Sequence, residues 1–237
     1  ILVSLMMVNN ETGAINDIAA VARMLKAENS IALLHTDAVQ GFLKVPFSAK
    51  TLGADMITIS GHKIHAPKGI GALYIRSGLK LPPYIHGGGQ ERGIRAGTEA
   101  TPQIAAFGEA VRIAKAEMPE ANKRMEALRA QCVQTLTDTV PGIVFLGGGS
   151  AHILSLSLPG YRSEVLMTYL EAKGIYVSKS SACKRGKRSH VLEAIGAPDK
   201  VIDGALRVSF SRHTTAEECA YFCEALAAAR KEMQTHE

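Results

Sequence analysis

Two side chains with complementary chemistry follow apolar runs of the sequence: Lys63, in the run 60–63 (SGHK), and Asp37, in the run 35–40 (HTDAVQ). A lysine fixed behind a buried strand is partly desolvated, which lowers its pKa and frees the amine to attack an aldehyde. A carboxylate beside a pyridine nitrogen keeps that ring protonated and makes it an electron sink. Alone, Lys63 is interpreted as a surface lysine in a turn and Asp37 as a helix N-cap. Together they predict a pyridoxal-phosphate site with Lys63 as the Schiff base.

Polar neighbours extend this predicted site. Ser60 and His62 can hydrogen-bond a phosphate or an aldehyde group beside Lys63. Gln40 and Asn10 can donate to the phenolic oxygen of the same ring.

Cys183 is the second chemical feature, in a polar segment with four cations at the next five positions, Lys184, Arg185, Lys187 and Arg188. Nearby cations favour the thiolate, which is the nucleophilic form of cysteine. A solvated basic turn with an incidental cysteine explains the segment equally well when it is taken alone. A basic loop can also bind RNA phosphates, but no interleaved aromatic residues favour that interpretation.

Arg207 stands on an otherwise apolar stretch, Leu206–Ser209. A guanidinium there needs a partner, and a bidentate substrate carboxylate would serve. A structural aspartate or glutamate would serve as well.

These residues follow the ends of predicted strands. Apolar runs at 2–8, 31–35, 56–59 and 71–75, with a helical pattern at 16–28, predict an α/β fold: a three-layer, mostly parallel sheet with helices on both faces. In such sheets, ligands bind beyond the carboxyl ends of the strands. Asn10, Asp37 and residues 60–63 all fall at such ends.

The second half of the chain predicts a smaller α+β domain after a glycine-containing loop at 82–101. We place the large domain at residues 1–115 and the small domain at 116–237. The expected elements are a long helix at 102–139 with a possible break near Pro119, strands at 152–158, 175–178 and 205–210, and helices at 163–173, 188–195 and 215–234.

Bulk properties narrow the class of protein. No apolar run approaches the roughly 20 residues that span a bilayer, so we expect no membrane partner. The modest formal charge of +5 permits an acidic partner or RNA but does not argue for either, and we expect no direct nucleic-acid partner. The four cysteines include no Cys-x-x-Cys pair, which favours a reducing cytoplasm. Cys219 and Cys223 share a helix face, and buried small side chains explain them better than half of a metal site, so no metal is expected.

The motifs in order resemble those of the cysteine desulfurases, class V members of the fold-type I pyridoxal-phosphate enzymes. The resemblance covers nearly the whole chain and rests on several runs in sequence: 9–13 (NNETG), 35–40 (HTDAVQ), 60–64 (SGHKI), 67–71 (PKGIG), 86–98 (HGGGQERGIRAGT), 181–183 (SAC) and 207–209 (RVS). Each run alone is weakly specific, whereas the seven runs in order are highly specific.

The resemblance implies a role for each matching residue. Lys63 would hold the cofactor and move protons, Asp37 would pair with the pyridine nitrogen, and Cys183 would attack the sulfur of L-cysteine to form a persulfide and release alanine. The remaining implied roles are ring and substrate positioning by Asn10 and Gln40, phosphate binding by Ser60 and His62, phosphate binding across a homodimer by Thr98, and carboxylate binding by Arg207.

The same resemblance implies a sulfur-acceptor protein, either an iron–sulfur scaffold or a tRNA-thiolation enzyme. Two related activities stay open: a selenocysteine lyase and a class V aminotransferase. Because the chain opens at Ile1 within an apolar run, we also expect a fragment of something longer. Such a fragment would lack part of the cofactor-binding large domain. A third alternative is therefore a truncated product that folds or dimerises but cannot hold the cofactor.

Overall fold

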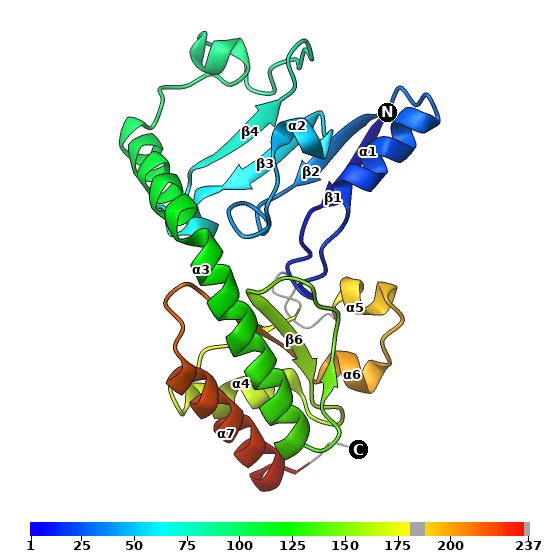
Figure 1. Cartoon of the computed structure of the whole chain (residues 1–237), viewed down its shortest axis with the longest axis vertical. Helices are drawn as coiled ribbons and strands as arrows, with labels where there is room; N and C mark the ends of the chain where they lie inside the picture. The colour runs from blue at the N-terminus through cyan, green and yellow to red at the C-terminus, as the bar shows by residue number, and fades with distance from the viewer. Residues whose placement is uncertain (181–187, 235–237) are drawn as a thin grey trace. The chain divides into compact units, whose positions relative to one another are not determined.

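The computed structural model describes residues 1–180 and 188–234 (Figure 1). The chain forms two compact units. The first comprises Ile1–Val8 and Asn16–Met118, and the second comprises Asn9–Ile15 and Pro119–Glu237. The boundary predicted between residues 115 and 116 stays a prediction for the domains of the whole protein.

The first unit is built on a four-stranded mixed sheet, which confirms the predicted α/β class. Its strands lie in the order β1-β2-β3-β4. β1, β2 and β3 are parallel, and β4 runs antiparallel to β3. The bounds of the strands are Leu2–Met6 for β1, Leu33–Asp37 for β2, Met56–Ser60 for β3 and Gly71–Ile75 for β4.

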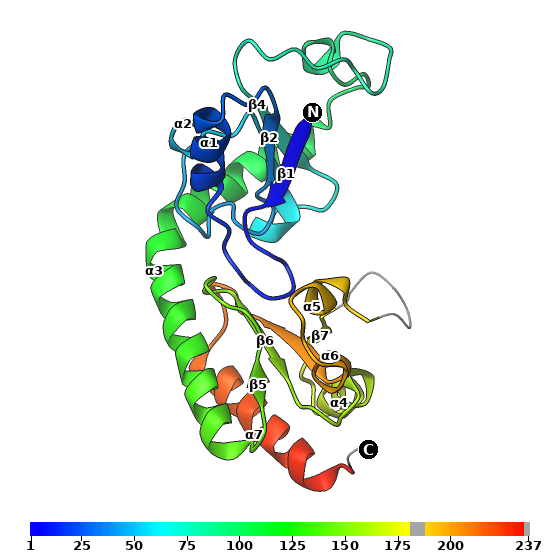
Figure 2. The same ribbon diagram turned by 90° about the vertical axis from the view of Figure 1, so that its right-hand side faces the viewer.

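Two helices of the first unit begin at side-chain caps. α1 (Ile18–Ala27) follows Asp17, whose carboxylate accepts from the backbone N–H of Ala20 at 2.8 Å. α2 (Ala49–Leu52) follows Ser48, which caps it in the same way. These caps satisfy backbone donors that have no partner within the helix. Figure 2 shows α1 and α2 on the same face of the sheet.

The long helix α3 (Thr101–Thr139) continues through Pro119, where the sequence predicted a possible break. Proline removes one backbone donor and disturbs the preceding turn. The hydrogen-bonded turns on both sides sustain the helix. The two units divide within α3, between Met118 and Pro119. A short 3-10 helix, η2 (Gln90–Gly93), lies in the loop that precedes α3.

The second unit carries an antiparallel sheet in the order β5-β6-β8-β7. Its long strands are β6 (Ile153–Ser157) and β8 (Ala205–Ser209), and its short strands are β5 (Val144–Phe145) and β7 (Ser178–Lys179). Four helices complete it: α4 (Ser163–Glu171), α5 (His190–Ala194), α6 (Asp199–Asp203) and α7 (Ala216–Glu232). Sequence patterning did not predict β5 or α6, because a two-residue strand and a five-residue helix carry too little periodicity.

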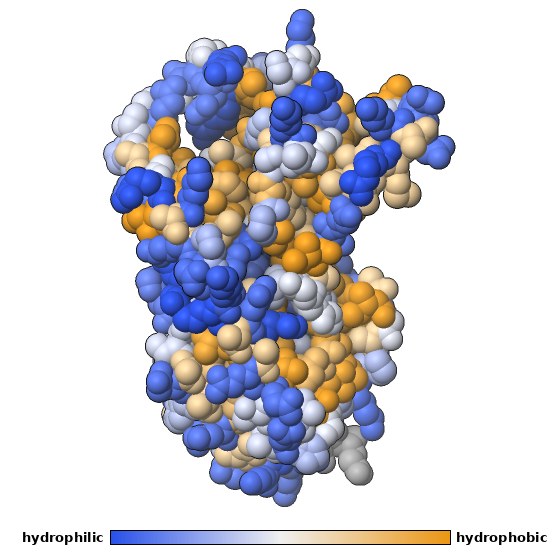
Figure 3. Space-filling model, in the orientation of Figure 1, coloured by the Kyte–Doolittle hydropathy of each residue, from blue (hydrophilic) through white to orange (hydrophobic). Residues whose placement is uncertain are grey.

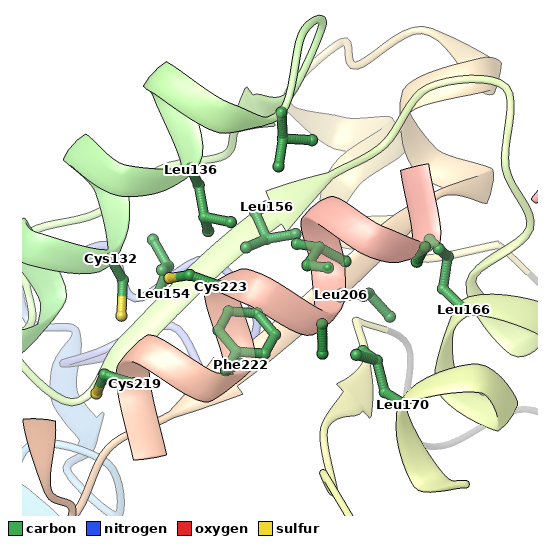
Figure 4. Close-up of a cluster of buried hydrophobic side chains, with 14 of the residues drawn as sticks. Cys132, Leu136, Leu154, Leu156, Leu166, Leu170, Leu206, Cys219, Phe222 and Cys223 are labelled. Atoms are coloured by element: carbon green, nitrogen blue, oxygen red, sulfur yellow. The ribbon is translucent and has the colours of Figure 1, made fainter. Parts of the chain in front are cut away.

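The core of the second unit is a cluster of leucines from β6, β8, α3, α4 and α7, around Phe222 (Figure 4). Cys132, Cys219 and Cys223 lie in this cluster and are 4% exposed or less. The interpretation of Cys219 and Cys223 as buried apolar residues is therefore confirmed. Within the described part of the chain, no group of three or more metal-ligating side chains occurs.

Residues Asn9–Ile15 belong to the second unit although they follow β1 in sequence. The backbone N–H of Ser150 donates to the carbonyl of Gly13 at 3.0 Å, and Ala14 forms a β-bridge with Gly149. Gly147 lies so close to Thr12 that an added Cβ would stand 2.9 Å from the Thr12 carbonyl oxygen. This close approach requires glycine at position 147.

The surface carries hydrophilic and hydrophobic side chains side by side on the face seen in Figure 3. Within residues 1–180 and 188–234, none of the helices has the length and apolar character to span a bilayer.

Candidate functional site

The carboxyl ends of β2 and β3 bring predicted site residues to one edge of the first sheet. The two strands are parallel, and Asp37 at the end of β2 pairs in register with Thr58 of β3. Ser60 ends β3 two residues later, and residues 61–63 continue from it. The edge expected to bind a ligand therefore carries Asp37, Ser60, His62 and Lys63.

Asp37 is half-buried and is held by the turn that follows it. Its side-chain Oδ1 accepts from the backbone N–H of Val39 at 2.9 Å, and the backbone N–H of Ala38 donates to the carbonyl of Thr58 at 2.9 Å. Gln40, in the same turn, is only 8% exposed. The carboxylate thus begins the turn as an N-cap would, and it still lies at the strand end where a ligand is expected.

Lys63 lies in the 3-10 helix η1 (Gly61–Ile64), directly behind β3. The side chains of Ser60 and His62 hydrogen-bond each other, with 2.7 Å between Ser60 Oγ and His62 Nδ1. His65 ends η1 in a left-handed conformation, at φ 67°. The short helix, the Ser60–His62 bond and the left-handed end together fix the backbone that carries Lys63.

Positive charge concentrates around Lys63. Desolvation lowers the pKa of His62, and the charges of Lys63, Lys68 and Lys44 lower that pKa further. Burial lowers the pKa of Lys44 to about 8, and the charge of Lys63 adds to the effect. The sequence reasoning missed Lys44, because a lysine seven positions after Asp37 has nothing in its pattern to distinguish it from a surface residue.

This donor set fits pyridoxal phosphate. A primary amine, a carboxylate and a hydrogen-bonded serine–histidine pair share one sheet edge, and the charges of neighbouring lysines act on the histidine. The amine suits an aldehyde, the carboxylate suits a ring nitrogen that carries a proton, and the cations suit a phosphate dianion. Lys63 with Asp37 would hold the ring, and Ser60 with His62 would hold the phosphate.

The second unit brings together Arg207 and Asn10. Arg207 is half-buried on β8, in register with Ser155 of β6 on one side and Ser178 of β7 on the other. Its Nη1 donates to the main-chain carbonyl of Asn10 at 2.9 Å. The predicted partner was a substrate carboxylate or an acidic side chain. The contact observed here is a backbone carbonyl, which leaves the role in substrate binding a prediction.

Glu11 and Ser189 form a further contact in the second unit that sequence reasoning missed. Both side chains are buried, and Ser189 Oγ donates to Glu11 Oε2 at 2.5 Å. Ser189 also caps α5 by accepting from the backbone N–H of Leu192 at 3.1 Å. A glutamate inside the turn-rich run 9–13 gave no signal for a partner 178 residues away.

A pocket of about 390 Å³ lies between the N-terminus of α4 and α6 in the second unit. Its lining includes Lys179 and Ser180 together with Arg188 and Ser189. Cys183 lies outside the described residues, between these two pairs in sequence. Thr98 is exposed in the loop that precedes α3, and its role across a dimer stays a prediction.

Comparison of the sequence with known proteins identifies a matching family and several relatives. The model of the aminotransferase class-V family matches residues 1–222. The chain is 42% identical over 222 residues to cysteine desulfurase 2 of Trichormus variabilis, covering 92% of this chain and 55% of that protein. It is also 42% identical to the cysteine desulfurase IscS of Methanosarcina thermophila, covering 92% of this chain and 54% of that protein. The chain thus spans about half the length of these relatives.

Solved structures of similar fold lead to the same family. A NifS-like protein superposes with a TM-score of 0.90 at 39% identity, over 98% of this chain and 61% of that one. A NifS-like protein from Rickettsia africae superposes with a TM-score of 0.89 at 30% identity, over 97% of this chain and 62% of that one. The partial pyridoxal-phosphate transferase fold expected from the sequence is confirmed by these likenesses. By sequence and by structure, the chain belongs to the aminotransferase class-V family.

Proposed function

We propose that the protein containing this chain is a pyridoxal-phosphate-dependent cysteine desulfurase, which converts L-cysteine to L-alanine and transfers the sulfur to Cys183. The observation that carries this proposal is the shared sheet edge of Lys63, Asp37 and the Ser60–His62 pair, in a chain 42% identical to cysteine desulfurases. One similar structure, at 28% identity, is that of SspA in complex with cysteine.

Pyridoxal phosphate, when bound, supplies an electron sink conjugated to the substrate amine. Lys63 would hold the cofactor through its Nζ and then move protons beside it. Asp37 would keep a proton on the pyridine nitrogen, and Ser60 with His62 would bind the phosphate. Desolvation and then the charges of the neighbouring lysines lower the pKa of His62, which favours the neutral ring, in which one nitrogen accepts and the other donates. Asn10 and Gln40 would position the ring oxygen and the substrate.

Sulfur transfer would use residues of the second unit. Arg207 would hold the carboxylate of L-cysteine by paired hydrogen bonds. The thiolate of Cys183 would attack the substrate sulfur, so that a sulfur–sulfur bond forms and the carbon–sulfur bond breaks. The electron pair stays with the carbon, which takes up a proton and leaves as alanine. The products are alanine and a persulfide on Cys183.

The proposed partners follow from the same activity. The protein would act as a cytoplasmic homodimer, with Thr98 reaching the phosphate of the partner subunit. The persulfide would pass to an acceptor protein, an iron–sulfur scaffold or a tRNA-thiolation enzyme. Cys132, Cys219 and Cys223 are free thiols, which supports a reducing compartment.

Two substitutions in the whole protein test this function. Lys63→Ala is expected to abolish the visible absorbance of the bound cofactor and the mass gained after borohydride reduction. Cys183→Ser is expected to retain that absorbance and to lose alanine release from L-cysteine. Lys50→Ala serves as the control, since Lys50 is an exposed lysine on α2 of the first unit.

Each alternative gives a different result. Full turnover of L-cysteine by the Cys183→Ser protein would contradict the persulfide step. Turnover of L-selenocysteine or an amino-group acceptor in that variant would indicate a related class V activity instead. An unchanged mass after borohydride treatment of the wild type would show a protein that does not hold the cofactor.

A further inference from the structure

The turn that begins at Asn9 is held together by the side chain of that residue. Asn9 Oδ1 accepts from the backbone N–H groups of Glu11 and Thr12, each at 2.9 Å, and from the hydroxyl of Thr12 at 3.2 Å. The backbone N–H of Gly13 donates to the carbonyl of Asn9 at 2.9 Å. An asparagine side chain that binds the backbone a few residues later gives a compact turn of defined shape. This turn sets the backbone direction of Asn10 and Glu11.

The guanidinium of Arg207 binds the middle of the turn. Its Nη1 donates to the carbonyl of Asn10 at 2.9 Å. A guanidinium carries five N–H groups in one rigid plane, so a bond from one of them restricts the direction of the whole group. Asn10 and Arg207 are also the residues that we propose to contact L-cysteine. The position of the turn therefore affects the direction of the guanidinium.

The side chain of Glu11 fastens the same turn to the start of α5. Ser189 Oγ donates to Glu11 Oε2 at 2.5 Å, and it accepts from the backbone N–H of Leu192 at 3.1 Å. The single hydrogen of the hydroxyl goes to the carboxylate and a lone pair goes to the helix, so both contacts fix its orientation. Glu11 and Ser189 are both buried. Separating them would leave buried polar groups without partners, which costs free energy.

A backbone contact holds the end of the turn independently of the Glu11 side chain. The backbone N–H of Ser150 donates to the carbonyl of Gly13 at 3.0 Å. Only main-chain atoms take part, so this contact is available whatever side chain stands at position 11. Shortening Glu11 should therefore release Asn10 from its position while the run 9–15 stays in the second unit.

We propose that Glu11 is a positioning residue for substrate binding: by binding Ser189, it holds the carbonyl of Asn10 where that carbonyl orients Arg207 toward the carboxylate of the amino-acid substrate. The inference rests on the proposed function. All four residues belong to the second unit, and their contacts form one continuous series. A bidentate contact with a carboxylate depends on the direction of the guanidinium plane. A displaced Asn10 should therefore weaken that contact specifically.

The test compares two ligands that differ in the carboxylate. L-Alanine carries an amino group and a carboxylate, whereas ethylamine carries the amino group alone. Each ligand is titrated into the whole protein loaded with cofactor, and the change in cofactor absorbance gives its dissociation constant. A contact with the carboxylate contributes to the affinity for L-alanine only. Hydrogen exchange of residues 9–15 is measured separately in the ligand-free protein.

Three substitutions at Glu11 vary its contact with Ser189. Glu11→Ala removes the carboxylate, Glu11→Asp shortens the side chain by one methylene group, and Glu11→Gln keeps an oxygen that can accept from the serine. Ser157→Ala is the matched control. The buried hydroxyl of Ser157 donates to the carbonyl of Val201 at 2.6 Å in the same unit, a bond that includes no residue of the run 9–15.

We expect Glu11→Ala and Glu11→Asp to weaken the binding of L-alanine about tenfold, to leave the binding of ethylamine unchanged, and to speed hydrogen exchange in the run 9–15. Glu11→Gln should retain more of the affinity for L-alanine, because its amide oxygen can replace the carboxylate oxygen. Ser157→Ala should bind both ligands as the wild type does.

Equal losses for L-alanine and ethylamine would overturn the inference, because Glu11 would then act on the cofactor or on the fold as a whole. Faster exchange with an unchanged affinity for L-alanine would also overturn it, since the contact would be structural only. If Glu11→Ala does not fold, an unchanged affinity of Glu11→Asp for L-alanine would have the same consequence.

Failure of the proposed function has a different signature, which is visible in the wild type. A wild-type protein without cofactor absorbance, or without any response to either ligand, would contradict the proposed function and the inference with it.

Discussion

At the scale of single residues, Lys44 is the least expected member of the site. Its ordinary pKa is 10.5, and burial together with the charge of Lys63 lowers it to about 8 in the fold. Between these two values the unfolded chain binds a proton that the folded chain has lost. Folding therefore becomes more favourable as the pH rises through this window, and the cost of burying the charge is fully present below pH 8.

Lys44→Met tests this dependence. At pH 7 the variant should gain about 2 kcal/mol in free energy of unfolding relative to wild type, because no charge has to be buried. At pH 9.5 most of that gain should disappear. Urea unfolding at both values measures the difference, with the exposed Lys50→Met as control. An equal effect of Lys44→Met at both pH values would contradict the lowered pKa.

The four cysteines should differ in reactivity. The hydrogen bond that the Cys132 thiol donates to Cys223, together with burial, raises the pKa of Cys132, and burial raises the pKa of Cys219 to about 12. Thiols in that state react slowly with iodoacetamide, because the thiolate is the nucleophile. At pH 8 we expect Cys183 to be alkylated at least about tenfold faster than Cys132 and Cys219. Peptide mass spectrometry over time measures each rate, and equal rates in the folded protein would refute the prediction.

Lys63 and Lys44 differ in how far a local sequence pattern can predict their positions. The place of Lys63 directly after a buried strand was predictable because an apolar run precedes its motif, and its role stays a prediction. Lys44 and Glu11 depend on burial and on contacts distant in sequence, which no local pattern encodes. The contact of Arg207 with the carbonyl of Asn10 was missed for the same reason, since every residue has a backbone carbonyl and none gives a signal in the sequence.

At the scale of elements, the contact between the segment Asn9–Ile15 and the second unit depends on Gly147. This glycine has φ +69°, and a Cβ there would stand 2.7 Å from the Cβ of Thr12 and 2.9 Å from its carbonyl oxygen. Gly142 has a similar φ of +80° with nothing within 4 Å. The two positions share the backbone strain and differ only in the contact.

Gly147→Ala and Gly142→Ala separate these contributions. Both should lose about 1 kcal/mol in free energy of unfolding from the positive φ. Gly147→Ala should lose a further 1–3 kcal/mol or so, because the segment must move away from its neighbour. Chemical denaturation measures both variants. Equal losses would show that the segment does not pack against Gly147 in solution.

The elements themselves were largely predictable, and the exceptions have physical causes. β1 to β4, α1, α3 and α7 were predicted from their apolar patterns, and α1 and α7 also begin at side-chain caps. α2 and α6 are single turns, too short for a pattern. β7 spans only Ser178–Lys179, whereas an apolar stretch at 175–178 predicted a longer strand. α3 continues across Pro119. The helical turns on both sides contribute more to stability than the one backbone hydrogen bond that proline removes.

At the scale of the whole molecule, the second unit is discontinuous in sequence. A protein consisting of residues 119–237 alone would lack the carboxylate of Glu11 at Ser189 and the backbone partner of Ser150. Buried polar groups that lose their partners cost free energy. We expect residues 9–15, fused through a flexible linker, to raise the urea midpoint of this fragment.

The same fusion with Glu11→Ala is the matched control and should give a smaller increase. If the fused segment leaves the midpoint unchanged, the division of the chain into these two units would not hold in solution.

The Glu11–Ser189 contact also has a consequence for the order in which the protein is made. The two residues are 178 positions apart, and a ribosome adds roughly 5–20 residues per second. Glu11 therefore leaves the ribosome about 10–35 seconds before its hydrogen-bond donor exists. During that interval the run 9–15 has to remain unpaired and available, exposed to chaperones and to other nascent chains. The contact of Arg207 with the carbonyl of Asn10 spans 197 positions, so it too can form only after a comparable delay.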